Sequence, residues 1–209
     1  MVYKNLFYRL FFSILFFSIF FVAINNKYLL FILGTFIYLL VLYEIFKFFK
    51  KFFYLIIIYL FTSYSFFCLY FLYFFDYLIF NLFVFTIISF DTFSYFTGKL
   101  LGKNYIFKSI SPKKTLEGYL GGIFFTNAII IFYSYLFNMK FGFITFIMLL
   151  NIIIFFSIIG DLIESYFKRK NNIKDSSKYL PGHGGYFDRF DSFIASIIMI
   201  TLFSFILNL

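Results

Sequence analysis

Long apolar runs constrain this chain more than any other feature of its sequence. Seven stretches of about 20 residues, the length that crosses the hydrocarbon core of a bilayer, follow one another and are separated by polar or basic breaks. Hydrophobic residues make up 63% of the 209 residues and charged residues 13%, which excludes an ordinary soluble domain. The sequence therefore predicts an all-α fold, a polytopic integral membrane bundle of about seven transmembrane helices. The predicted spans are residues 6–24, 28–46, 52–75, 77–98, 119–137, 142–163 and 190–208.

Basic residues are distributed unevenly between the two sides of this bundle. Lys and Arg collect on the cytoplasmic side of membrane proteins. With the amino terminus in the cytoplasm, sixteen of the 18 Lys and Arg residues fall in cytoplasmic segments, and only Lys27 and Lys140 fall outside. We therefore expect the two long polar loops to face the cytoplasm. The formal charge of +9 follows from this topology and from affinity for anionic lipid, and we expect no nucleic-acid partner.

The organisation of the chain is simple. No convincing internal repeat is visible, so we expect one membrane domain over residues 1–209. The first span lacks a small-residue cleavage site after it, and we expect it to be retained rather than removed as a signal peptide. The domain divides into N-terminal membrane helices (residues 1–84), a part with both long loops (85–192) and the last transmembrane helix (190–208).

A polar segment before the last predicted span interrupts the apolar pattern. Helical spacing places Asp161, Glu164 and Ser165 on one face. Asp188 and Asp191 repeat the i, i+3 spacing at the start of the last span. Carboxylates that converge from two helices suit Mg²⁺, which binds a few carboxylates together with substrate phosphate oxygens. Ion pairing with the surrounding Lys and Arg residues is the structural alternative, and we favour metal binding because charge beside a bilayer is costly.

The sequence KYLPGHGG, residues 178–185, lies between these acidic pairs. Its glycines permit tight turns and a close approach to a ligand, and backbone N–H groups of such a loop can bind phosphate oxygens. Lys168, Arg169 and Lys174 add positive charge nearby. A plain reversal between two helices is the alternative. His183, the only histidine, could act as a general base, bind phosphate or stabilise the turn, and we do not favour the base role.

A second polar constellation follows the fourth predicted span. Asp91 is a carboxylate within an apolar run, which makes it a functional candidate, although pairing with Lys99 would make it structural. The sequence SPKKTLEG, residues 111–118, combines lysine, hydroxyl and a glycine-bearing helix N-terminus, and such a combination can bind phosphate. An ordinary basic loop is the alternative. The candidates in this loop are Ser111, Lys113, Lys114 and Thr115.

Together these motifs resemble those of the CDP-diacylglycerol synthases, also called phosphatidate cytidylyltransferases. The family signature S-x-x-K-R-x4-K-D-x4-L-P-G-H-G-G-x-x-D-R-x-D is matched in the same spacing from Ser165 to Asp191. The elements D-x-x-x-Y-x-x-G-K, from Asp91, and S-P-K-K-T-x-E-G, from Ser111, are also similar. The specific resemblance covers roughly residues 85–192, and the chain is shorter than typical bacterial members.

The resemblance implies a Mg²⁺-dependent nucleotidyltransferase of phospholipid biosynthesis, which transfers CMP from CTP to phosphatidate and releases pyrophosphate. It implies a location in the bacterial inner membrane, among membrane lipid, with the catalytic core of residues 85–192 on the cytoplasmic side. A homodimer is compatible with it. On the family pattern the catalytic residues are Asp161, Lys168, Asp188 and Asp191, and the metal ligands are Asp161 and Asp188 supported by Glu164 and Asp191. The implied substrate-binding residues are Asp91, Ser111, Lys113, Lys114, Thr115, Ser165, Arg169, Lys174, Gly182, His183, Gly184 and Gly185.

Alternatives come from two classes. A related CTP-dependent membrane enzyme, such as a polyprenol or phytol kinase or an archaeal-type CDP-lipid synthase, would differ in its lipid substrate. A transporter could use polar residues in broken helices, but the polar groups here collect on one side and no inverted repeat is visible. A CDP-alcohol phosphotransferase is disfavoured because its D-G-x2-A-R motif is absent.

Overall fold

The computed structural model describes residues 15, 18–136, 142–180 and 184–207. Within this part of the chain six helices are long and apolar enough to cross a membrane, by length and composition, and the only strand-like pairings are isolated bridges. The prediction of an all-α polytopic bundle is confirmed. The elements are α2 (Lys27–Phe48), α3 (Phe53–Leu69), the π-helical η1 (Tyr70–Phe74) that continues α3, α4 (Tyr77–Leu101), α5 (Leu116–Leu136), α6 (Phe143–Lys170) and α7 (Phe187–Leu207).

The last six predicted spans each correspond to one continuous helical segment, with ends displaced by about three residues or fewer except at one position. Helix α6 continues past the predicted end at residue 163 to Lys170. The charged residues there leave the apolar core but remain compatible with a helix, because side chains such as Glu, Lys and Arg are good helix formers. Asn171 is the C-cap residue of the helix, and Asn172 takes a left-handed φ of 57°. The predicted span 6–24 falls mostly outside the described residues, of which residues 18–23 are helical.

Short polar side chains cap the N-termini of two helices, α2 and α4. Asn26 Oδ1 accepts hydrogen bonds from the N–H groups of Tyr28 and Leu29 at the start of α2. Asp76 accepts from the N–H of Ile79 at the start of α4. These side chains satisfy donors that have no partner inside the helix. Polar residues at the breaks between spans therefore set where the helices begin.

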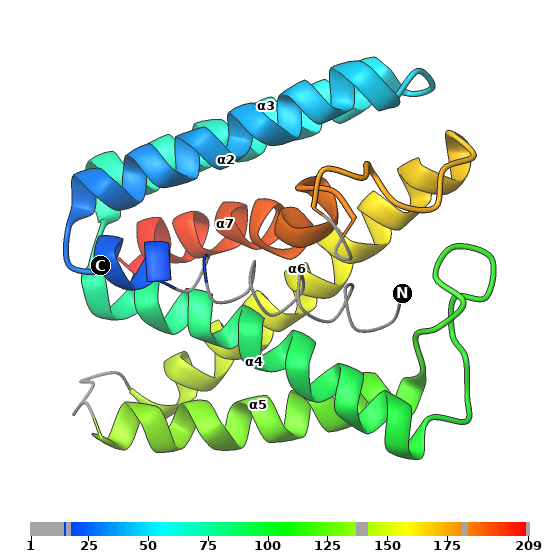
Figure 1. Cartoon of the computed structure of the whole chain (residues 1–209). Coiled ribbons are helices and arrows are strands. Elements are labelled where there is room, and N and C mark those ends of the chain that lie inside the picture. Colours follow the sequence, from blue (N-terminus) through cyan, green and yellow to red (C-terminus); the bar gives the residue numbers. More distant parts are fainter. Residues whose placement is uncertain (1–14, 16–17, 137–141, 181–183, 208–209) are drawn as a thin grey trace.

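The helices pack as three neighbouring pairs. Helices α4 and α5 lie along one another, α6 crosses α7, and α2 lies beside α3 (Figure 1). Helix α7 is central, because it contacts α3 on one side and α6 on the other. One continuous apolar core of buried residues runs through these helices.

The α2–α3 turn, the α4–α5 loop and the α6–α7 loop lie at the same end of the bundle (Figure 1). Asn171, after α6, ties two of them together. Its Oδ1 atom accepts hydrogen bonds from the backbone N–H groups of Lys50 (2.9 Å) and Lys51 (2.7 Å). Its Nδ2 atom donates to the carbonyl of Lys51. The three most basic connections of the described chain therefore lie at one end of the bundle.

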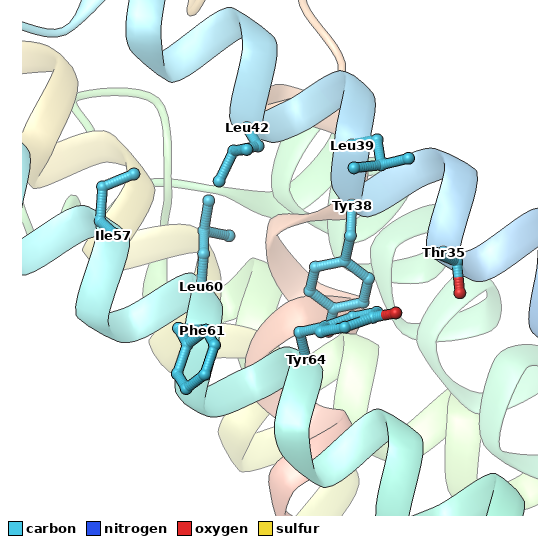
Figure 2. A pocket seen from close by; sticks show the side chains of 8 residues that line it. All are labelled: Thr35, Tyr38, Leu39, Leu42, Ile57, Leu60, Phe61 and Tyr64. Atoms are coloured by element: carbon cyan, nitrogen blue, oxygen red, sulfur yellow. The ribbon is translucent and has the colours of Figure 1, made fainter.

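Away from this end, an apolar groove of about 250 Å³ opens between α2 and α3 (Figure 2). Two of its lining tyrosines, Tyr38 and Tyr64, pack edge to face with their ring centroids 5.2 Å apart. The groove belongs to the spanning segments. Its lining is completed by Thr35, Leu39, Leu42, Ile57, Leu60 and Phe61.

Candidate functional site

Helices α6 and α7 approach one another closely where the polar segment begins. A side chain at Gly160 of α6 would overlap the backbone carbonyl of Asp191 and the Cβ atom of Ala195, both on α7. A Cβ atom there would push the two helices apart, so the contact depends on glycine. The turns of α6 and α7 that carry the carboxylates consequently lie side by side.

Lys168 joins the carboxylates of these two helices. Its Nζ atom lies 2.7 Å from Glu164 Oε2, one turn earlier on α6, and 2.6 Å from Asp188 Oδ1 on α7. The side chains of Lys168, Glu164 and Asp188 are 12%, 2% and 8% exposed, respectively. Each of these buried charges depends on the others, because removing one partner leaves an uncompensated charge. One carboxylate from each of the two acidic pairs that the sequence predicts therefore contacts the same ammonium group.

Asp188 also organises the loop that precedes α7. Its Oδ2 atom accepts hydrogen bonds from the backbone N–H groups of Ser176 (2.9 Å) and Gly185 (2.8 Å). Within this loop, the backbones of Leu180 and Gly184 exchange two hydrogen bonds. Gly184 has a left-handed φ of 88°, which favours glycine. One N–H group of the predicted phosphate-binding loop is thus bound to a carboxylate of the site.

Lys114 brings the α4–α5 loop to the same place. It forms an ion pair with Asp161 of α6. Burial lowers the pKa of the Lys114 ammonium below its ordinary value, and the carboxylates of Asp191, Asp91 and Glu164 oppose this shift. The contacts of Lys114 and Lys168 thus bring together predicted residues of α6, α7 and the α4–α5 loop.

Arg169 provides a second connection between the two loops. Its Nε atom donates a hydrogen bond to the carbonyl of Ile110 (3.2 Å), which is next to the predicted residue Ser111. Its Nη1 atom donates to the carbonyl of Ile173 (3.4 Å) in its own loop. Two backbone carbonyls therefore fix the position of the Arg169 guanidinium, which lies beside the loop where we expect phosphate to bind.

Thr115 is buried, whereas the predicted lysines at residues 113 and 174 are exposed. Thr115 is buried, and its Oγ1 atom accepts a hydrogen bond from the N–H of Gly118 (3.2 Å), so it begins α5. Lys113 and Lys174 are exposed on the two loops. Exposed lysines can reach an approaching anion, whereas the Thr115 hydroxyl already has a structural partner.

The remaining predicted residues take different positions. Ser165 is buried on α6, and Asp91 is exposed on α4. Gly182 and His183 lie outside the described residues.

The sequence analysis missed two residues of α2 that reach the site loop. Glu44 is fully buried, and its Oε2 atom accepts hydrogen bonds from the N–H groups of Tyr186 (2.7 Å) and Phe187 (3.2 Å). One turn later, Lys47 Nζ donates to Tyr179 Oη (2.8 Å), and this contact lowers the pKa of the Tyr179 hydroxyl. A lone carboxylate in an apolar span is itself a signal of function, and it could have identified Glu44.

Oxygen donors suited to a divalent cation are present but not gathered into a closed cage. Glu164 Oε1 is buried and has no hydrogen-bond partner among the described residues. In the same part of the chain, no three Asp, Glu, His or Cys side chains are grouped so that they could hold a metal ion by themselves. Mg²⁺ commonly binds one or two carboxylates and completes its shell with substrate phosphate and water. The donor chemistry therefore fits Mg²⁺ that is held jointly with a substrate.

The fold and this site define a polytopic membrane protein with a carboxylate and lysine cluster at one end of its helices. A model of the cytidylyltransferase family matches residues 2–207. The chain therefore belongs to the cytidylyltransferase family.

Several curated relatives are similar to part of this chain. Proteins named phosphatidate cytidylyltransferase from Staphylococcus aureus (strain COL) and Bacillus subtilis (strain 168) are each 44% identical to this chain, over 106 and 111 residues. These matches cover 50% and 52% of this chain and 40% of each relative. A protein of the same name from Staphylococcus haemolyticus is 45% identical over 106 residues, 50% of this chain and 40% of the relative. The matched region thus spans less than half of these relatives.

Proposed function

We propose that this protein transfers CMP from CTP to phosphatidate, forming CDP-diacylglycerol and pyrophosphate. The observation that carries the proposal is the pairing of Lys114 and Lys168 with carboxylates of α6 and α7, at the end of a membrane bundle. A lipid phosphate and a nucleoside triphosphate are both polyanions, so a site that joins them must supply positive charge. Relatives that bear the name of this activity support the choice of substrates.

The proposed reaction is a direct displacement. A phosphate oxygen of phosphatidate attacks the α-phosphorus of CTP, and the bond between that phosphorus and the bridging oxygen breaks. Pyrophosphate leaves with the electron pair. Because the attacking oxygen is already anionic near neutral pH, the step requires no general base. The chain then needs to position and neutralise its substrates more than to move protons.

Three basic side chains are assigned to substrate phosphates: Lys114, Lys168 and Arg169. In the structure two of them pair with carboxylates, which keeps the ammonium groups in place before a substrate arrives. Mg²⁺ held by Asp161 and Asp188, with support from Glu164 and Asp191, would reduce the repulsion between the two polyanions.

The placement of the site suits a lipid substrate. It lies where spanning helices end, so a headgroup can reach the polar cluster while the acyl chains stay in the bilayer. The basic loops at this end favour a cytoplasmic orientation in the bacterial inner membrane, where CTP is available. We assign the catalytic core to residues 85–192 of a single membrane domain.

The test is an assay of purified protein in detergent with CTP, phosphatidate and Mg²⁺. Label at the α-phosphate of CTP should enter lipid, and pyrophosphate should appear only when lipid is present. Asp188→Ala should reduce the rate by about 100-fold or more, as expected for a group that organises charge at the reacting centre. Asp76→Ala is the matched control, because Asp76 caps α4 at the opposite end of the bundle and should leave the rate unchanged.

Transfer of label from the γ-phosphate to a polyprenol or another lipid alcohol would identify a kinase instead. Absence of transfer from either position, with folded protein and varied lipids, would reject the nucleotidyltransferase proposal and favour a transport role.

A further inference from the structure

Glu44 is the one acidic residue that precedes Asp76 in the sequence, and it is completely buried near the end of α2. A carboxylate in this position is costly unless hydrogen bonds compensate it. Its partners are the N–H groups of Tyr186 and Phe187, at the start of α7. Such groups have no acceptor within their own helix, and the helix dipole favours a negative charge beside them. Glu44 therefore caps α7 from another helix.

The two hydrogen bonds act on the segment that carries Asp188. The N–H of Gly185 donates to Asp188 Oδ2, and the next two N–H groups donate to Glu44 Oε2. Lys168 holds the other oxygen of Asp188. The Asp188 carboxylate is thus held from α6, while the backbone before it is held from α2.

Packing makes this arrangement specific. Any Cβ atom at residue 185 would overlap both Glu44 Oε1 and Ser176 Oγ. The backbone N–H of Ser176 in turn donates to Asp188 Oδ2. Glu44, Ser176, Gly185 and Asp188 consequently form one closely packed unit, in which a displaced Glu44 would disturb the Asp188 carboxylate.

A second tie from α2 holds the other side of the same loop. Lys47 Nζ donates to Tyr179 Oη and lies 5.3 Å from the centre of the Tyr179 ring. The ring centroids of Tyr179 and Tyr186 are 6.3 Å apart. The end of α2 therefore contacts the loop both before and after its glycines.

We infer that Glu44 is a positioning residue for the transfer reaction, which fixes the backbone at Tyr186 and Phe187 and thereby the Asp188 carboxylate. Glu44 acts through Asp188 and does not touch the substrates. The inference rests on the proposed function, because that function assigns Asp188 to the reacting phosphates.

Amide hydrogen exchange and kinetics together test this role. In Glu44→Ala, we expect faster exchange in peptides that cover residues 184–188, and a kcat lower by about 10- to 100-fold, as found for residues that orient a metal or catalytic ligand. The KM for CTP should change much less. Glu44→Gln keeps an acceptor oxygen and should restore both slow exchange and most of kcat. Tyr38→Phe is the control on the same helix as Glu44. It removes a buried 2.5 Å hydrogen bond to Ser63 of α3 and should match wild type in both exchange and kcat.

Wild-type exchange and kcat in folded Glu44→Ala would overturn the inference. If Glu44→Ala does not fold, Glu44→Asp decides, because its shorter side chain keeps the charge but should not reach both N–H groups. Unchanged exchange and kcat in that variant would also overturn it. If the wild-type protein forms no CDP-diacylglycerol, the proposed function fails, and the exchange data alone then show whether Glu44 orders the loop.

Discussion

The α6–α7 pair and the α2–α3 pair are both built from long apolar helices, but they are held together differently. Helices α6 and α7 meet at Gly160, and Lys168 links their carboxylates. Helices α2 and α3 pack through aromatic rings, such as Phe31 and Phe67 with centroids 5.6 Å apart, and leave an apolar groove between them (Figure 2). In lipid, apolar surface gives little drive for helices to associate, so close packing and polar contacts must provide it. The difference predicts that polar and close contacts of α6–α7 control activity, whereas the aromatic contacts of α2–α3 control stability.

The largest effect should come from Lys168. In Lys168→Met the buried carboxylates of Glu164 and Asp188 lose their shared cation, which costs about 3–5 kcal/mol when a buried ion pair is broken. We expect a lower midpoint of thermal unfolding and kcat/KM reduced by about 100-fold or more, as for other preorganised charges. Thermal unfolding in detergent and the CTP assay measure both. A variant with kcat/KM within about twofold of wild type would break the comparison.

Two glycine substitutions sharpen the comparison between the α6–α7 and α2–α3 pairs. Gly160→Ala places a methyl group against the backbone carbonyl of Asp191, so α7 must shift, and a displacement of about 1 Å at a reacting group can cost 100-fold in rate. Gly34→Ala on α2 instead meets the far end of the Phe67 ring. Overpacking there should cost about 1–3 kcal/mol of stability and leave kcat unchanged.

Measuring kcat and thermal unfolding for both glycine variants separates the effect of displaced reacting groups on the rate from the effect of overpacking on stability. Equal losses of kcat in the two variants would show that the pairs do not differ in the way proposed.

The smallest effect on activity should come from the groove. Leu60 is 2% exposed and lines it. Leu60→Ala enlarges the groove and should lower the free energy of unfolding by about 2 kcal/mol, the low end for such a substitution, because a lipid chain can fill the space. The specific activity of the folded fraction should equal that of wild type. A large loss of kcat at full folding would place the groove in the reaction.

The predicted and observed helices agree because span length and apolar composition are local properties. The spacing of Asp161, Glu164 and Ser165 likewise predicted one helical face, and α6 contains all three. The end of α6 was placed too early, since the sequence analysis equated the end of the apolar run with the end of the helix. Lys168 shows the next limit. Its i, i+4 spacing from Glu164 could have indicated that ion pair, but its sequence position does not reveal the contact with Asp188 of α7.

The sequence by itself determined the membrane bundle, its spans and the polar residues from which a site could be built, because hydropathy and residue spacing act over a few turns of chain. Only the tertiary structure decided which of these residues meet. It paired Lys114 with Asp161 and brought Glu44 to the start of α7, across 142 positions of sequence. Such contacts follow from how helices cross and where glycine permits close approach, and the cost of a buried charge then requires a partner at that place.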